Sequence, residues 1–435
     1  MNAPVLTIEP SRDLQADLRQ VLNAVQRAAD PGECLAVETS RLRAFVGDGR
    51  AIHVLAVGKA SVPMLNAVSR LSGVRWKRLL ATVVPEWLPR SLPMAQLAAA
   101  GELLECDHPV ATERNLHAAA KVRQFVSSIP SDESLLVLLS GGASAHLTLP
   151  VEGLSLSSLV ACTTDLMRSG ASIHELNTVR KHLEQLKGGR LASMCTAGNV
   201  LVLVLSDVIG DPLDVIASGP FVADPSMPQD AIAVLRARGL WGRHPAVEAL
   251  LERTSRASHR AVQAVGAIEH VVIGNNAGLV DAAAGALAHL GYRLDEVHKC
   301  RQGPVDEVLA MLAVRSGGGP SACVVGGEWV VQVGEASGRG GPSQELALLA
   351  AVRGDGEPGW AMLTYSSDGI DGPTNAAGAI VDGETVSRSE RAGCYVARAV
   401  VEHDSHRALA AAGVLLNPGP TGTNVNHIAV LVRDS

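Results

Sequence analysis

The first half of the chain repeats one pattern: an apolar, β-branched run, a short loop that holds Gly or Ser, and an amphipathic stretch. Runs of unbroken hydrophobicity are typical of strands buried on both faces, as in a parallel sheet. The runs cover residues 51–57, 79–84, 135–140 and 200–206, and the stretches with apolar residues at helical spacing cover 14–29, 156–167 and 174–186. This alternation predicts an α/β fold in which helices wrap a parallel sheet.

A chain of 435 residues exceeds what one hydrophobic core usually serves, which favours two domains. A helical pattern over 231–251 runs into a basic, Ser-rich stretch at 252–260, and a new strand begins at 270. We therefore predict domains at residues 1–260 and 261–435. In the second domain the pattern predicts helices at 277–290, 343–352 and within 384–411, and strands at 323–333, 360–364 and 428–432.

Composition argues against several classes of protein. Hydrophobic residues make up 47% of the chain and charged residues 19%, as in an ordinary globular protein. An aromatic content of 3% and a net charge of −7 argue against a nucleic-acid partner. The seven cysteines form no zinc pattern. No apolar run reaches the roughly 18 residues that a membrane span needs. The first residues lack the features of a signal or transit peptide. We expect a cytoplasmic protein with small-molecule partners and no membrane partner; a homo-oligomer is left open.

Two strand-to-loop junctions of the first domain carry candidate anion-binding groups. Lys59 follows the strand at 51–57 after one glycine, so it lies at the carboxyl end of a strand, where ligands bind in open α/β sheets. The loop Ser140-Gly141-Gly142-Ala143-Ser144 follows another buried strand and can cradle a phosphate or carboxylate in its amides. It is not a Walker A loop, because the Lys-Ser/Thr pair is absent. A solvated surface lysine and a loop of small residues that serves packing are the structural alternatives.

Further polar candidates lie on a predicted helix and after the next strand. Asn177, Arg180 and Lys181 share one helical face that can grip an anion, although a solvated basic helix has the same pattern. Asp207 follows the strand at 200–206, where a carboxylate can take a metal ion or a hydroxyl proton. It can equally cap a turn, a common role for Asp near Gly and Pro.

The second domain holds two Gly-rich loops. The first, Gly338-Arg339-Gly340-Gly341, precedes a predicted helix, so its amides and the Arg339 guanidinium can bind phosphate. It misses the dinucleotide fingerprint, because Ser343 replaces the third glycine and no acidic residue closes the next strand. The second loop contains Asp368 and Asp371, which can point two carboxylates into one cleft and hold the magnesium of a phosphoryl transfer. A turn without a ligand is the alternative for this loop.

Taken in order, these motifs resemble the type 2 glycerate kinase family, whose C-terminal half is called the MOFRL domain. The resemblance covers nearly the whole chain. It rests on the segments Val57–Ala60, Asp107–Val110, Ser140–Gly142, Leu176–Leu183, Lys187–Ala192, Ser206–Asp211, Ile216–Pro220, Gly338–Glu345, Asp368–Thr374 and Thr421–Asn426.

The resemblance implies a Rossmann-like N-terminal domain with a parallel sheet flanked by helices, a smaller α/β C-terminal domain, and a site between them. It also implies an ATP- and Mg²⁺-dependent kinase that transfers the γ-phosphate to the 2-hydroxyl of D-glycerate, giving 2-phosphoglycerate and ADP. Lys59 and Arg339 would be its active-site cations. We expect Asp207 to be catalytic and Asp368 and Asp371 to bind the metal, and which carboxylate acts as the base is left open. The residues expected to contact substrate or phosphate are Ser140, Gly141, Gly142, Ser144, Asn177, Arg180, Lys181, Gly338, Gly340, Gly341, Thr421, Gly422 and Asn424.

Four positions depart from the family pattern. Ala143 stands where glycine is usual, His146 where an aliphatic residue is common, and Asn375 and His427 where aspartates are usual. The segment 83–88 is also unlike its counterpart. These changes bear on the acceptor, so a kinase on another short 2-hydroxy sugar acid, such as a tetronate, is the first alternative. A hydroxypyruvate reductase and a non-catalytic binding protein are the others.

Overall fold

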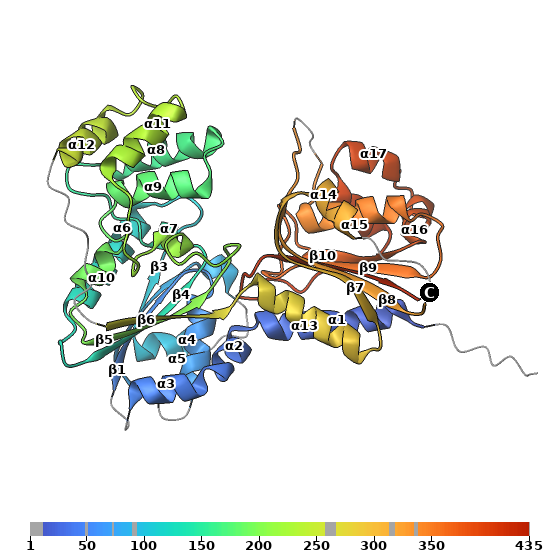
Figure 1. Ribbon diagram of the computed structural model, residues 1–435, viewed down its shortest axis with the longest axis horizontal. Coiled ribbons are helices and arrows are strands. Elements are labelled where there is room, and N and C mark those ends of the chain that lie inside the picture. The colour runs from blue at the N-terminus through green and yellow to red at the C-terminus, as the bar shows by residue number, and fades with distance from the viewer. Residues whose placement is uncertain are drawn as a thin grey trace, which may run out of the picture. The chain divides into compact units, whose positions relative to one another are not determined.

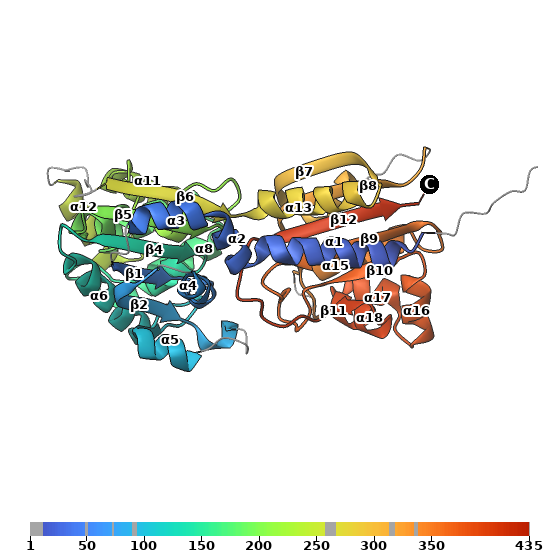
Figure 2. The same cartoon turned by 90° about the horizontal axis from the view of Figure 1, so that it is seen from below.

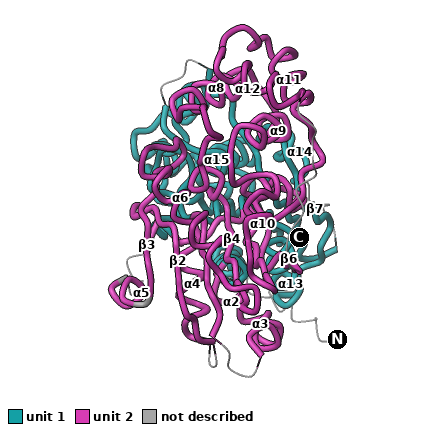
Figure 3. Tube along the Cα trace, turned by 90° about the vertical axis from the view of Figure 1, so that its left-hand side faces the viewer, with its two compact units in different colours: residues 1–29, 276–420, 426–435 teal, residues 30–275, 421–425 magenta. Residues whose placement is uncertain are grey.

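The computed structural model describes residues 12–47, 51–71, 74–88, 94–256, 267–312, 318–334 and 338–434. The chain divides into two compact units (Figure 3). Residues 30–275 and 421–425 form one, here called the parallel-sheet unit, and residues 1–29, 276–420 and 426–435 form the other, the mixed-sheet unit. The domain boundary predicted at residue 260 lies outside the described residues.

A six-stranded sheet forms the centre of the parallel-sheet unit (Figure 1). Its strands are β1 (Ile52–Val57), β2 (Trp76–Val83), β3 (Glu102–Glu105), β4 (Ser134–Ser140), β5 (Asn199–Leu205) and β6 (Ala267–Gly274). Every neighbouring pair in the order β3-β2-β1-β4-β5-β6 is parallel, which confirms the predicted sheet. The strand order reverses between β1 and β4, so their carboxyl ends flank the topological switch point, where ligands bind in such sheets.

Helices cover both faces of this sheet. Helices α2 and α4 lie on one face, and α6 and α10 lie on the other, where they share a core with the strands. The helices and 3₁₀ turns outside the bundle described next are α2 (Pro31–Val37), α3 (Thr39–Val46), α4 (Ser61–Arg70), η1 (Pro85–Trp87), α5 (Met94–Ala100), α6 (Glu113–Ser127), α7 (Ala143–His146), α10 (Arg190–Met194) and η2 (Ile216–Ser218).

Four further helices form a small bundle with a separate core. They are α8 (Leu156–Arg168), α9 (Ile173–Leu183), α11 (Pro228–Ala237) and α12 (Pro245–Ser255). The sequence pattern predicts a single helix over 231–251, and that prediction is wrong. Gly239 and Gly242 take φ values of 67° and 95° between α11 and α12, which ends the first helix before Pro245 begins the second.

The mixed-sheet unit is built on a second six-stranded sheet. Its order is β11-β10-β9-β12-β8-β7, in which only the pair β7–β8 is parallel among the described strands. The strands are β7 (Arg293–Pro304), β8 (Ser321–Val330), β9 (Trp360–Ser366), β10 (Gly378–Asp382), β11 (Leu415–Leu416) and β12 (His427–Arg433). Strand β7 lies at the sheet edge and is largely polar, so it lacks the apolar run by which β8, β9 and β12 were predicted. The short strands β10 and β11 were not predicted either.

Helices also flank the mixed sheet. Helices α1 (Leu14–Ala29) and α13 (Asn276–His289) lie side by side on one face (Figure 2). The other helices are α14 (Val305–Met311), α15 (Pro342–Arg353), α16 (Thr385–Arg391), α17 (Val396–Val401) and α18 (Ser405–Ala411), and α15 shares the core of this unit. Helix α1 has the predicted bounds, yet it packs with the C-terminal half of the chain, because its buried stripe meets α13 and β9.

Candidate active site

The two candidate loops of the parallel-sheet unit are bonded to each other. The amide of Lys59 donates to the Gly141 carbonyl oxygen at 2.7 Å, and the amide of Ala60 donates to Ser140 Oγ at 2.9 Å. Gly58 has a φ of 115° and packs so closely that a Cβ there would collide with Ser140. The structure therefore fixes Lys59 beside the Ser140–Gly142 loop at the switch point.

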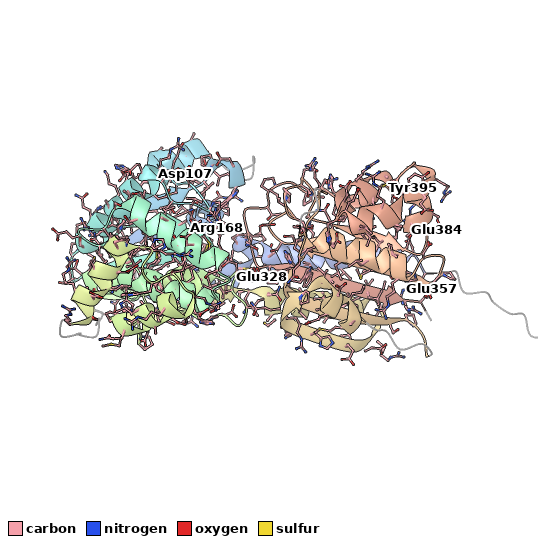
Figure 4. All side chains as sticks on the ribbon, turned by 90° about the horizontal axis from the view of Figure 1, so that it is seen from above. Asp107, Arg168, Glu328, Glu357, Glu384 and Tyr395 are labelled. Atoms are coloured by element: carbon pink, nitrogen blue, oxygen red, sulfur yellow. The ribbon has the colours of Figure 1, made fainter. Side chains whose placement is uncertain are left out.

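An aromatic residue that the sequence analysis did not select holds the Lys59 side chain. Its Nζ lies 4.7 Å from the centroid of the Trp87 ring, in a cation–π contact. The edge of Trp87 in turn meets His108, with ring centroids 4.5 Å apart. His108 directly follows Asp107, a half-buried residue labelled in Figure 4. The ammonium group thus lies over an aromatic ring, and no carboxylate of the described residues forms an ion pair with it.

Two histidines near Lys59 remain neutral. Burial lowers the pKa of His108 to about 3, helped by the positive charges of Lys59 and Arg180 and by His146. Burial and the Lys59 charge lower the pKa of His146 to about 4. His146 Nδ1 lies 2.7 Å from Thr82 Oγ1, and its Nε2 has no hydrogen-bond partner in the described structure. Lys59 and Arg180, rather than imidazolium groups, therefore carry the positive charge of this site.

The buried neutral state of His146 predicts a pH effect on stability. Below its ordinary pKa of 6.5 the unfolded chain binds a proton that the folded chain, with a pKa of about 4, does not bind, so stability falls as the pH decreases through this window. In His146→Leu the loss of unfolding free energy between pH 7 and pH 5 should shrink by about 2 kcal/mol. Urea unfolding at the two pH values measures this. His117→Leu, at an exposed position on α6, should leave the loss unchanged, and an equal loss in His146→Leu and the parent chain would contradict a neutral buried His146.

Polar groups of three elements meet next to the Ser140–Gly142 loop. Ser144 Oγ lies 2.8 Å from Ser218 Oγ, which donates to Asn177 Oδ1 at 2.8 Å. Arg180 Nη2 donates to the Ser144 carbonyl oxygen at 3.1 Å. Ala217 and Ser218 both have left-handed φ values, 54° and 61°, which is strained for residues with a Cβ. The predicted residues Ser144, Asn177 and Arg180 are therefore brought together, and Ser218 joins them.

Lys181 lies elsewhere on the same helix. It is 5% exposed, and its Nζ lies 3.4 Å from Asp214 Oδ2 and 3.5 Å from Asp224 Oδ1. Two carboxylates therefore compensate its charge, and it is neither the expected anion ligand nor a solvated surface lysine. Further along the chain, Lys187 forms a fully buried ion pair with Glu184, and burial lowers the pKa of Lys187 to about 7.

Asp207 lies directly against the Ser140–Gly142 loop. A Cβ at Gly141 would collide with the Asp207 carboxylate, so only glycine allows this approach. Asp207 is half-buried and follows β5, the neighbour of β4 in the sheet. The loop at Thr421, Gly422 and Asn424 also belongs to the parallel-sheet unit, although it lies in the C-terminal half of the sequence.

The Gly-rich loops of the mixed-sheet unit are joined through Asp371. Its Oδ1 accepts from the Ser343 amide at 3.0 Å, and its Oδ2 accepts from the Gln344 amide at 2.8 Å and from Gln344 Nε2 at 3.1 Å. Asp371 is 1% exposed, and burial raises its pKa. The amides of Ser343 and Gln344, in the first turn of α15, are therefore taken by this carboxylate. Asp371 caps a helix and has no oxygen left exposed for a metal ion.

Asp368 has a different environment from Asp371. It is half-buried, and its Oδ1 accepts from Ser366 Oγ at 2.9 Å and from the Ile370 amide at 3.1 Å. Within the described residues, no group of three or more His, Cys, Asp or Glu side chains is arranged to hold a metal ion. Although Asp368 and Asp371 are close in sequence, their carboxylates therefore have different surroundings. Asp371 is buried and caps a helix, and Asp368 lies in a half-buried turn.

Arg339 is exposed at the edge of the mixed-sheet unit. Its Nη2 donates to the Pro373 carbonyl oxygen at 3.2 Å, and its amide donates to Asp404 Oδ1 at 3.1 Å. Burial and the Arg339 charge lower the pKa of His406. The loops of Gly338, Gly340 and Gly341 line a pocket of about 280 Å³ beside this cation.

Comparison with known proteins gives the family of the chain. Residues 17–252 match a domain of unknown function, DUF4147, and residues 321–427 match the MOFRL family. D-glycerate 2-kinase from Thermotoga maritima is 36% identical over 388 residues, which cover 87% of this chain and 90% of the relative. The chain belongs to the glycerate kinase family.

A solved structure and a further sequence relative extend this comparison of the glycerate kinase family member. The crystal structure of glycerate kinase from Thermotoga maritima is similar with a TM-score of 0.81 at 32% identity, covering 96% of this chain and 99% of that chain. A relative from Agrobacterium vitis, provisionally named hydroxypyruvate reductase, is 34% identical over 426 residues, 95% of this chain and 93% of its own length. The family member is an enzyme, a kinase, and the α/β fold that the resemblance implied is confirmed. None of its described helices is long and apolar enough to span a bilayer.

Proposed function

We propose that this glycerate kinase family member transfers the γ-phosphate of ATP, with Mg²⁺, to the 2-hydroxyl of D-glycerate and releases 2-phosphoglycerate and ADP. One observation carries the proposal: Lys59 lies beside the Ser140–Gly142 loop at the switch point of the parallel sheet, in a chain with a relative named for this reaction. Phosphoryl transfer depends on positioning and on neutralising the charge of the transferred group, which a fixed ammonium group provides.

The residues of the parallel-sheet unit receive separate roles in this proposal. Lys59 neutralises the oxygens of the phosphoryl group, and the amides of Gly141 and Gly142 orient it. Arg180, beside Ser144, supplies the second cation for an acidic acceptor. Asp207, packed against Gly141, takes the proton of the acceptor hydroxyl. His108 and His146 are neutral and add no charge to this group.

Magnesium in kinases is held by one or two carboxylates together with substrate phosphates, so a cluster of three protein ligands is not required. A half-buried carboxylate such as Asp368 offers the hard oxygen donors that the ion prefers. Asp371 does not fit, because it is 1% exposed and both of its oxygens already accept hydrogen bonds. When bound, the ion would neutralise phosphate charge, and Arg339 is the guanidinium that the mixed-sheet unit offers to phosphate.

The test is ADP release from ATP and Mg²⁺ with D-glycerate, L-glycerate, a tetronate and hydroxypyruvate as separate acceptors, with the product position read by phosphorus NMR. Selective conversion of D-glycerate to the 2-phosphate is the expected result. Preferred turnover of the tetronate would replace the proposed acceptor with another short 2-hydroxy acid.

The name of the Agrobacterium vitis relative makes a hydroxypyruvate reductase the second candidate. The sequence argues against it, since the Gly338–Gly341 loop lacks the third glycine of a dinucleotide fingerprint. Titration with NADH and NADPH separates the two functions. Saturable binding, with oxidation of the cofactor by hydroxypyruvate, would favour the reductase over the kinase for this substrate.

A further inference from the structure

The pocket beside Arg339 lies wholly within the mixed-sheet unit and has a volume of about 280 Å³. Its apolar walls come from Val331 and Val333, which follow β8, and from Pro342 and Pro373. Val333 is 50% exposed, so an apolar wall of this pocket faces solvent. An open, mostly apolar hollow of this size with a few polar groups at its edge is typical of a small-molecule site.

Two polar side chains lie at one end of the pocket. His403 Nδ1 lies 2.8 Å from Glu345 Oε1, and Glu345 is 3% exposed. His403 has a φ of 51°, a left-handed backbone that is costly for a residue with a Cβ. The buried carboxylate therefore fixes a histidine ring at the pocket, and that ring offers its second nitrogen for hydrogen bonding.

The cation Arg339 lies between two glycines that line the same pocket, Gly338 and Gly340. The Arg339 guanidinium donates to the carbonyl oxygen of Pro373, whose residue lines the pocket. The loop that carries Arg339 joins α15, and Asp371 holds the start of that helix. A ligand that fits therefore combines a largely apolar body with an anionic group on one side. Among the reactants of a kinase, the nucleotide has this form.

We propose that this pocket binds the nucleobase of the phosphate donor and that Arg339 contacts the phosphates of the same molecule. The proposal rests on the proposed function, because it requires that the enzyme uses a nucleotide. It assigns the base to Val331, Val333, Pro342 and Pro373, with His403 as its hydrogen-bonding partner. Arg339 and the apolar pocket then bind two parts of one nucleotide, its phosphates and its base.

The test compares two exposed valines of one strand region. Val333→Asn removes an apolar wall of the pocket, and Val330→Asn is the matched control, because Val330 is 53% exposed and does not line the pocket. Calorimetric titration with ADP should give about fivefold weaker binding for Val333→Asn, since part of a valine contact with the base is lost. The control should keep the affinity of the parent chain. Inorganic tripolyphosphate, which has no base, should bind both variants equally.

Kinetics supply the second readout. The KM for ATP should rise by a similar factor in Val333→Asn, while the KM for D-glycerate and the turnover number stay unchanged. Equal ADP affinities of Val333→Asn and Val330→Asn, in an enzyme that binds ADP, would overturn the base pocket and leave the kinase proposal intact. Failure of the parent chain to bind or turn over any nucleotide would instead overturn the proposed function and this inference with it.

Discussion

Lys59→Ala is expected to lower kcat/KM by about a thousandfold, because it removes a preorganised charge from the site where the transferred phosphoryl group is stabilised. The free energy of unfolding should change little, because Lys59 is only half-buried and the substitution removes a single cation–π contact, with Trp87. Steady-state assays with ATP, Mg²⁺ and D-glycerate, together with thermal unfolding, measure both effects. Lys59→Met retains the aliphatic stem that packs near Gly142 and should be as inactive as the alanine variant.

A matched control tests whether activity depends on the positive charge of Lys59 or on any lysine charge of the same sheet. Lys77 is an exposed lysine in β2 of the same sheet and pairs with Glu133, so Lys77→Ala should keep nearly full activity. The histidines give an independent readout, because loss of the Lys59 charge should raise the pKa of both His108 and His146 in an NMR titration. Near-normal turnover in both Lys59 variants would remove this residue from the chemistry.

The sequence places Lys59, Ser140 and Asp207 at one edge of the sheet for a general reason. Each residue follows a buried parallel strand, and the carboxyl ends of parallel strands lie at one edge of the sheet. Trp87 could not be predicted in the same way, because its proximity to Lys59 depends on the pairing of β2 with β1. Sequence patterns indicate strands but not their order. His146 could be noticed in the sequence itself, because it is a polar residue within an apolar stretch.

The spacing of Asp368 and Asp371 could not distinguish the surroundings of the two carboxylates, for a different reason. It correctly placed both residues in one loop after a strand, but it could not show which donors each carboxylate meets. A signal was present in the neighbouring loop. Helix α15 begins at Gly341 and Pro342, and neither side chain can accept a hydrogen bond from its first amides. Such a helix needs a cap from a distant part of the chain, and Asp371 supplies it.

The role of Asp371 as a cap predicts a large loss of stability when it is removed. Asp371→Ala leaves the buried amides of Ser343 and Gln344 without their acceptor and removes one of the acceptors of Gln344 Nε2, which should cost about 3 kcal/mol of unfolding free energy. Asp371→Asn keeps one acceptor oxygen and should cost less. Urea unfolding without Mg²⁺ or nucleotide is the measurement, with Asp368→Ala as the half-buried control that should cost under about 1 kcal/mol.

This experiment also separates a cap from a metal ligand. A carboxylate kept only for Mg²⁺ would be a source of repulsion in the metal-free chain, so its removal would leave stability unchanged or raise it. A cap gives the opposite sign, because its hydrogen bonds form without any ion. The loop of Arg339 leads into the start of α15, so loss of the cap should also weaken ADP binding. Binding of D-glycerate to the Lys59 site should persist in the molecules that remain folded. An Asp371→Ala chain as stable as its parent would return this residue to the magnesium site.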